Sequence, residues 1–277
     1  MDRRHFLKTM IYAGAFLTLD SLIFPHKGQE SFSKDRNTET IKAGLLTLGS
    51  FDHGYKQDEI IDLIGKHISK HNLDIFLGPE WLFLPEKGLY TKKEKDDLVS
   101  KLVNTTKDRD TFSVPGTIMW HDNSFFYNSA PIITNGTLLD EYFKRTDGGS
   151  INLADERACP VKKYRKGQKR GVYKWRGYTI GVEICADHGH LKEEITNEKL
   201  PPLDIYLLSS CGMTLGSYST PLDKNGYALY SDGYYKASGA AKSTSYQDGE
   251  IIDLTEAVED KNLLIYELSM NKKQEQC

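Results

Sequence analysis

The sequence predicts an α/β fold whose sheets carry helices on their outer faces. A strand, an amphipathic helix and a second strand follow one another over residues 41–78, which is the pattern of a βαβ unit. Pairs of apolar runs joined by tight turns follow over 125–143 and 172–184 and predict hairpins. A simple dinucleotide-binding sheet does not contain such hairpins. Neither a Gly-x-Gly-x-x-Gly nor a Walker sequence is present, so no nucleotide cofactor is expected.

The elements of the first half follow from apolar spacing. Residues 41–48 predict a strand, 57–71 a helix, and 74–78 a short buried strand that Gly78-Pro79 ends. Glu80 and Trp81 follow directly, at the carboxyl end of that strand, where α/β folds place their chemistry. The residues that give the helix one apolar stripe are Ile60, Ile61, Ile64 and Ile68.

A second helix and a hairpin come next. Thr91 and Glu94 form a capping-box pattern for a helix running to about residue 107, with Leu98, Leu102 and Val103 facing inward. Residues 112–120 predict one strand. The hairpin joins 125–134 to 137–143 through Asn135-Gly136, and Lys144 closes its second strand.

The second half is less regular. Residues 145–170 predict a long polar loop holding Glu156, Cys159 and a basic run interpreted as a solvated loop. A hairpin around Arg176-Gly177 ends at Cys185, and residues 187–199 predict a helix. Strands are expected over 203–209 and 263–268, whereas the Gly-, Ser- and Tyr-rich stretch between them gives no clear assignment.

Composition sets the class of protein. The chain has 277 residues, 39% of them hydrophobic and 27% charged, which is typical of a soluble globular domain, here placed at residues 41–277. A formal net charge of −3 argues against nucleic acid as the main partner.

The N-terminus is interpreted as an export signal. Charged residues that include Arg3 and Arg4 precede a short apolar run, so residues 1–24 predict a twin-arginine signal and 25–40 a polar lead-in. Asp20 and the shortness of the run disfavour a membrane-spanning helix. The predicted location is therefore the periplasm or the medium, with no stable membrane span after export.

Four cysteines are too few for a disulfide scaffold. Cys159 and Cys211 could form a disulfide in an oxidising compartment, but their spacing alone does not decide this. No Cys-x-x-Cys or His-rich motif is present, so no metal site is expected.

Three reactive side chains each follow an apolar strand: Glu80, Lys144 and Cys185. A carboxylate, an ammonium and a thiol form a set of base, cation and nucleophile, which is what hydrolysis through a covalent acyl-enzyme requires. The predicted helix directly after Cys185 would favour the thiolate through its free N–H groups and dipole. Each residue alone also has a structural explanation, for Cys185 the capping of a core strand.

These motifs resemble those of the nitrilase superfamily of carbon–nitrogen hydrolases. The matching segments are Phe76-Leu-Gly-Pro-Glu80, Tyr127-Asn-Ser-Ala with Asn135-Gly-Thr and Tyr142-Phe-Lys144, and Gly181-Val-Glu-Ile-Cys185-Ala-Asp187. The resemblance covers roughly residues 41–210. It implies a four-layer αββα sandwich that usually dimerises by stacking.

The resemblance also implies roles. Cys185 would attack the carbon of a C–N bond, and Glu80 would accept the thiol proton and later activate water. Lys144 would stabilise the oxyanion together with the N–H of Ala186. A second family glutamate is assigned to Glu156, with the alternatives that Glu156 is a solvated acid or that Glu141 or Glu183 takes its place; Glu183 is expected to share the face of Cys185.

The pocket residues are assigned less firmly. Candidates that either bind substrate or pack in the core are Trp81, His121, Phe126, Tyr127 and Asn128. His188 is an alternative base for Cys185 or simply an early helix residue.

The predicted protein is an exported hydrolase that cleaves a small linear amide or carbamoyl compound through a thioester. The resemblance implies a homodimer. Ala186-Asp187 stands where nitrile-cleaving members place Trp-Glu, which favours amides. An acyltransferase on the same scaffold and a catalytically silent binding module are the alternatives, the latter because the chain after Ser210 departs from the family pattern.

Overall fold

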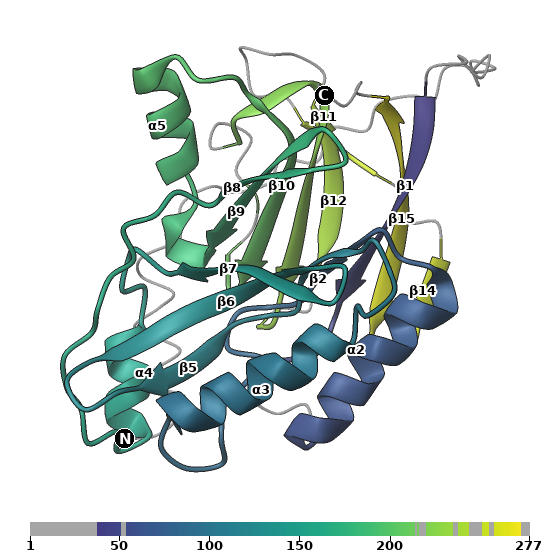
Figure 1. Cartoon of the computed structure of the whole chain (residues 1–277). Coiled ribbons are helices and arrows are strands. Elements are labelled where there is room, and N and C mark those ends of the chain that lie inside the picture. The colour runs from purple at the N-terminus through teal and green to yellow at the C-terminus, as the bar shows by residue number, and fades with distance from the viewer. Residues whose placement is uncertain are drawn as a thin grey trace, which may run out of the picture. The chain divides into compact units, whose positions relative to one another are not determined.

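Figure 1 shows the computed structural model, which describes residues 38–50, 54–213, 215, 220–234, 238–243, 251–254 and 258–272. The predicted signal segment and most of the lead-in lie outside the described residues. No described helix is long and apolar enough to cross a bilayer.

Two mixed sheets dominate the described residues. The first has nine strands in the order β14-β15-β1-β2-β4-β6-β5-β3, with β7 also paired to β6. Its strands are β1 (Thr38–Leu46), β2 (Ile75–Leu77), β3 (Tyr90–Thr91), β4 (Phe112–Val114), β5 (Ile118–His121), β6 (Phe126–Thr134), β7 (Thr137–Phe143), β14 (Val258–Asp260) and β15 (Leu263–Asn271).

The second sheet has six strands in the order β13-β12-β11-β10-β9-β8. They are β8 (Val172–Trp175), β9 (Tyr178–Ile184), β10 (Leu203–Ser210), β11 (Leu222–Asp232), β12 (Gly239–Ser243) and β13 (Ile251–Asp253). Strands β9, β10 and β11 run parallel, so their carboxyl ends meet at one edge of the sheet.

The helices cover the outer faces of the sheets. Helices α2 (Gln57–His71) and α3 (Lys92–Asn104) pack on the first sheet through a shared apolar cluster, and α5 (His190–Glu198) packs on the second (Figure 1). A third cluster joins the inner faces, with Ile75 and Leu77 from β2 against Val182 and Leu207 from the second sheet. These layers are the αββα sandwich expected from the resemblance.

Local sequence signals placed several elements correctly. The helix predicted over 57–71 is α2, and all four isoleucines of its stripe are buried. The Thr91–Glu94 capping box begins α3, and Asn135-Gly136 forms the predicted turn with φ of 48° and 64°. The hairpin around Arg176-Gly177 is β8–β9.

Three expectations were wrong. The strand expected over 112–120 is divided into β4 and β5 at Pro115-Gly116, because Gly116 has φ of 117°. The loop expected over 145–170 contains the short helix α4 (Ser150–Glu156). The helix expected over 187–199 begins only at His190, after the 3₁₀ turn Cys185–Asp187.

Candidate active site

Glu80, Lys144 and Cys185 come together between the sheets. Lys144 Nζ lies 2.6 Å from Glu80 Oε1, and the Cys185 thiol hydrogen-bonds the same carboxylate. Glu80 and Lys144 are fully buried and Cys185 is 6% exposed. Lys144 and Cys185 directly follow β7 and β9, and Glu80 lies three residues after the end of β2. The packing of the two inner faces is therefore what brings the three groups into contact.

The loop that carries Glu80 is fixed on both sides. A Cβ on Gly78 would lie 2.3 Å from the carbonyl oxygen of Pro115, so only glycine fits this close approach of two backbones. The Glu80 N–H donates to the carbonyl of Ser210, and its own carbonyl accepts from the Ser50 hydroxyl at 2.5 Å. Strand ends of both sheets therefore hold this residue.

Asn128 orients the carboxylate of Glu80. Its side-chain Nδ2 donates to Glu80 Oε1 at 2.8 Å. Its backbone carbonyl accepts the backbone N–H of Lys144 at 2.9 Å. Oε1 thus has two donors, whereas Glu80 Oε2 has no partner of regular hydrogen-bond geometry among the described nitrogens and oxygens. Oε2 is therefore the oxygen of this carboxylate with acceptor capacity left.

The charges of the site follow from its burial. Burial raises the pKa of Glu80, although the Lys144 ammonium and the hydrogen bonds from Lys144, Cys185 and Asn128 act to lower it. Burial alone would lower the pKa of Lys144, but the charge and hydrogen bond of Glu80 and the charge of Asp187 outweigh it, and the pKa lies above its usual value. Lys144 is therefore an ammonium at neutral pH.

Cys185 has a backbone conformation that turns it out of its strand. Its φ is 45°, in the left-handed region that non-glycine residues rarely occupy. The strand ends at Ile184, and the Cys211 N–H lies within hydrogen-bonding range of the sulfur. This sharp turn directs the thiol toward the inner face, where Glu80 and Lys144 lie.

The expectation that a helix N-terminus favours the thiolate form of Cys185 was wrong. Helix α5 begins five residues after Cys185, so its first N–H groups and dipole do not act on the sulfur. Burial first, then the charge of Glu80, raise the pKa of the thiol to about 12, and Lys144 offsets this only in part. The resting Cys185 side chain is a neutral thiol beside the Glu80 carboxylate.

The structure does not bring Glu156 to this site. Glu156 is exposed at the end of α4. Glu141 also points elsewhere, since it accepts from Lys95 Nζ and the Ser129 hydroxyl at 2.9 and 2.6 Å.

Glu183 is buried on the opposite face of its sheet from Cys185. Its carboxylate accepts the N–H groups of Gly189 and Leu191 and the Tyr206 hydroxyl, all on the α5 side. The expectation of a shared face was wrong because strand alternation ends where Cys185 adopts its positive φ. The second carboxylate near Lys144 is instead that of Asp187, which is fully buried and helps to raise the pKa of Lys144.

The other candidates divide between the site and the core. Trp81 lies beside the site, with its ring centroid 5.7 Å from Lys144 Nζ, and Ala186 follows the nucleophile. Tyr127 packs in the helix-side cluster, stacked on Trp120 at 4.2 Å, because it alternates with Asn128 along β6. Phe126 packs against Tyr164, and His121 is half-buried on β5.

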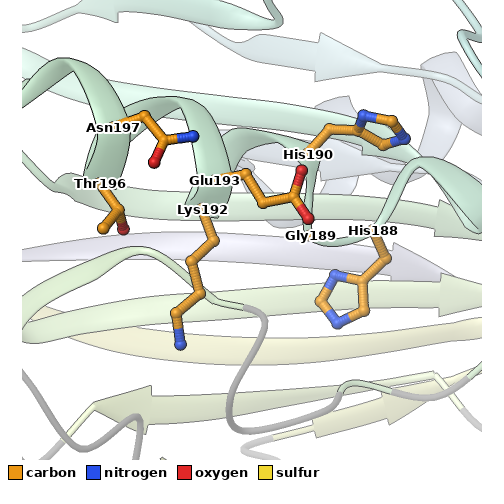
Figure 2. Close-up of a pocket in the computed structure, with 7 residues that line it drawn as sticks. All are labelled: His188, Gly189, His190, Lys192, Glu193, Thr196 and Asn197. Atoms are coloured by element: carbon orange, nitrogen blue, oxygen red, sulfur yellow. The ribbon is translucent and has the colours of Figure 1, made fainter.

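His188 lies away from the thiol. Its Nδ1 is 2.6 Å from the Tyr206 hydroxyl and 3.9 Å from Glu183 Oε2. His188 belongs to the lining of a pocket that runs along α5 from His190 to Asn197 (Figure 2). The volume of this pocket is about 440 Å³. That pocket lies on the outer side of the second sheet, so it is a separate feature from the buried set.

Sequence reasoning missed three neighbours of the set. Cys211 lies at the end of β10, next to β9, and is a free thiol, as is Cys159, so the two do not pair. Gly148 lies against the lysine, since a Cβ there would be 2.8 Å from Lys144 Nζ and 2.7 Å from the Ala186 Cβ. Asp187 is the last residue of the quoted motif, but its part in the site depends on Tyr142, Arg145 and Thr146, whose O–H and N–H groups donate to its carboxylate.

The fold is that of solved nitrilase-superfamily structures. Nit3 of Saccharomyces cerevisiae, a nitrilase-superfamily member, is 18% identical with a TM-score of 0.60, covering 84% of this chain and 91% of that one. An amidase from Nesterenkonia sp. AN1, solved with the acetamide moiety of fluoroacetamide on its active-site cysteine, is 15% identical with a TM-score of 0.58, covering 86% and 93%.

A glutamine-dependent NAD⁺ synthetase from Acinetobacter baumannii is also similar over 86% of this chain but only 48% of its own length, at 18% identity and a TM-score of 0.58. No family model and no curated protein matches the chain in sequence.

Proposed function

We propose that the chain is a carbon–nitrogen hydrolase that cleaves a small linear amide through a thioester on Cys185. The observation that carries the proposal is the buried contact of Glu80 with both Lys144 and the thiol. A base, a cation and a nucleophile within contact of one another are the groups that acyl transfer needs, and two of them have pKa values shifted by burial.

The proposed reaction begins with attack of the Cys185 sulfur on the amide carbon while Glu80 takes the thiol proton. The negative charge that develops on the carbonyl oxygen is stabilised by the Lys144 ammonium and the Ala186 N–H. Collapse of this intermediate breaks the C–N bond, and the proton on Glu80 passes to the departing amine. Glu80 then removes a proton from water, which attacks the thioester and releases the acid and the thiol.

Labelling and turnover test this proposal together. Fluoroacetamide, whose acetamide moiety is bound to the active-site cysteine in a mutant of the Nesterenkonia amidase, should add a single acetamide group at Cys185, seen by intact mass and peptide mapping. Cys185→Ser should abolish both the label and hydrolysis of a panel of linear amides. The matched control is Cys159→Ser, another buried free thiol, which should keep both.

Unchanged turnover in Cys185→Ser would refute the nucleophile. Transfer of the acyl group to an added amine or hydroxylamine in preference to water would instead identify an acyltransferase. The absence of any acyl group on Cys185 would favour the catalytically silent binding module.

The location of this activity is also a proposal. The adjacent Arg3 and Arg4 before a short apolar run support export by the twin-arginine route, which carries folded proteins and is compatible with a free thiol in the mature enzyme.

A further inference from the structure

Two histidines of α2 meet an aspartate of β14 on the outer side of the first sheet. His67 and His71 are four residues apart and so lie one above the other on the helix. Their rings stack with centroids 6.2 Å apart, and the ligand atoms of these two residues and Asp260 all lie within 4.8 Å of one another. Figure 1 shows the end of α2 beside β14.

His67 is buried at this cluster without satisfying its ring. The residue is 3% exposed, and neither nitrogen has a hydrogen-bond partner of regular geometry. Asp260 Oδ2 is 3.9 Å from Nδ1, and the backbone of Lys261 is a further polar neighbour of the ring. Burying a polar ring without regular hydrogen bonds is costly, and a ligand bound to the imidazole would offset this cost.

We propose that His67, His71 and Asp260 bind a divalent transition metal of the zinc class, with a fourth position open to water. Two imidazoles and one carboxylate are ligands that Zn²⁺, Co²⁺ and Ni²⁺ accept. Tetrahedral bonds of the usual length place donor atoms about 3.4 Å apart. The observed 2.9 Å between His71 Nε2 and Asp260 Oδ2 and 3.9 Å between His67 Nδ1 and the same oxygen bracket this spacing.

Lys70 competes for the aspartate. Its ammonium lies 2.6 Å from Asp260 Oδ2, but its side chain is 54% exposed and is able to turn into solvent. The other oxygen, Oδ1, accepts the N–H of Lys261. A metal must therefore displace an exposed cation and no buried group, and removal of that cation should strengthen binding.

The metal would tie α2 to an edge strand of the first sheet. Strand β14 pairs only with β15 among the described strands, and Asp260 links it to α2 through Lys70 and His71. Because a ligand of the native state alone raises stability by mass action, metal binding should raise the melting temperature.

Titration with Co²⁺ and Zn²⁺ tests the site. The experiment uses the full chain with Cys185→Ser, so that the nucleophile does not bind metal. Co²⁺ should give the visible d–d absorption of a tetrahedral site without thiolate charge transfer, and Zn²⁺ should displace it. His71→Ala and Asp260→Asn, which alter partly exposed side chains, should each weaken binding by more than about 100-fold, since even outer-shell changes cost 10- to 100-fold.

Two variants separate binding from structural damage. Lys70→Ala should bind at least about tenfold more tightly, corresponding to the loss of one competing charge-assisted hydrogen bond. His121→Ala, a half-buried histidine on β5, should leave affinity and the metal-induced rise in melting temperature unchanged. Absence of a Co²⁺ spectrum, or equal affinity in the wild type and Asp260→Asn, would overturn the proposal.

Discussion

The 2.6 Å contact between Lys144 Nζ and Glu80 Oε1 joins two fully buried side chains. Removing one partner of a buried ion pair leaves the other charge without compensation, which is more costly than removing both. The pair therefore has to be treated as one unit in any mutational test of this site.

A double-mutant cycle should show this coupling. Lys144→Met should lower the free energy of unfolding by about 3–5 kcal/mol, and Lys144→Met with Glu80→Gln should lose less than the sum of the two single changes. Denaturant unfolding monitored by circular dichroism measures each value. The exposed pair of Lys101 and Asp58, 2.7 Å apart, is the control, and Lys101→Met should cost less than about 1 kcal/mol. Additive losses at Glu80 and Lys144 would contradict the coupling.

The pH profile should report the base and not the thiol. Because the pKa of Cys185 is raised to about 12, the thiolate is scarce near neutral pH and attack depends on Glu80 being ionised. Activity should therefore fall on acidification through a pKa above the ordinary value of a glutamate, since burial raises the pKa of Glu80. Initial rates of amide hydrolysis against pH measure this limb.

Glu80→Gln should remove the acid limb together with about 100- to 10,000-fold of the rate. Glu141→Gln, which alters a carboxylate bonded to Lys95, is the control and should keep the wild-type profile. A profile governed by a thiol titrating near pH 8 to 9 would show that the nucleophile is activated in another way.

The space beside Lys144 should be sensitive to a single methyl group. Gly148 has φ of 51°, and a Cβ there would lie 2.8 Å from Lys144 Nζ. Gly148→Ala should therefore displace the ammonium and reduce kcat by at least about tenfold, in addition to roughly 1 kcal/mol of backbone strain. Steady-state kinetics and thermal unfolding measure the two effects.

Gly88→Ala separates strain from contact. Gly88 also has a positive φ, of 68°, but a Cβ there meets nothing within 4 Å. It should show the same loss of stability with unchanged kcat. Equal loss of activity in the two variants would attribute the effect at Gly148 to backbone strain.

Local signals in the sequence sufficed where neighbours along the chain decide the structure. The four-isoleucine stripe identified α2, and the turn at Asn135-Gly136 identified the β6–β7 hairpin. The one-residue register shift between Ile132 and Ile133, which brings Asn128 level with Lys144, had no such signal. The three strand ends were identifiable because an apolar run stopping at a Glu, Lys or Cys is visible in one dimension.

The remaining features depend on contacts that sequence spacing does not show. The positive φ of Cys185 reverses the face assigned to Glu183, and no residue type signals it because cysteine rarely adopts this conformation. Asp260 reaches His71 across 189 positions of the chain. The raised pKa of the thiol likewise follows from how completely the sheets bury it, which the motif alone does not reveal.

Export should depend on the two adjacent arginines. A receptor reads the arginine pair, so Arg3→Lys combined with Arg4→Lys should leave the protein in the cytoplasm with its N-terminus intact. Cell fractionation and intact mass of the product measure this. Arg36→Lys, a like change in the lead-in, should leave export unaffected, and normal export of the double variant would exclude the twin-arginine route.

Glu183 should make stability depend on pH even though it takes no part in the proposed chemistry. Burial raises its pKa to about 7, while the Tyr206 hydroxyl and the N–H groups of Leu191 and Gly189 act to lower it. Between its ordinary value of 4.5 and 7 the folded state therefore binds more protons than the unfolded state, so this residue lowers the free energy of unfolding as pH rises.

Replacing Glu183 by glutamine should remove this dependence. Glu183→Gln stays neutral, so its free energy of unfolding relative to the wild type should increase between pH 4.5 and 7 by up to roughly 3 kcal/mol. Urea unfolding at several pH values measures the difference. Glu156→Gln changes an exposed carboxylate and should give a curve parallel to the wild type. A parallel curve for Glu183→Gln as well would mean that the hydrogen bonds from α5 hold the carboxylate ionised, and that burial is not the stronger effect.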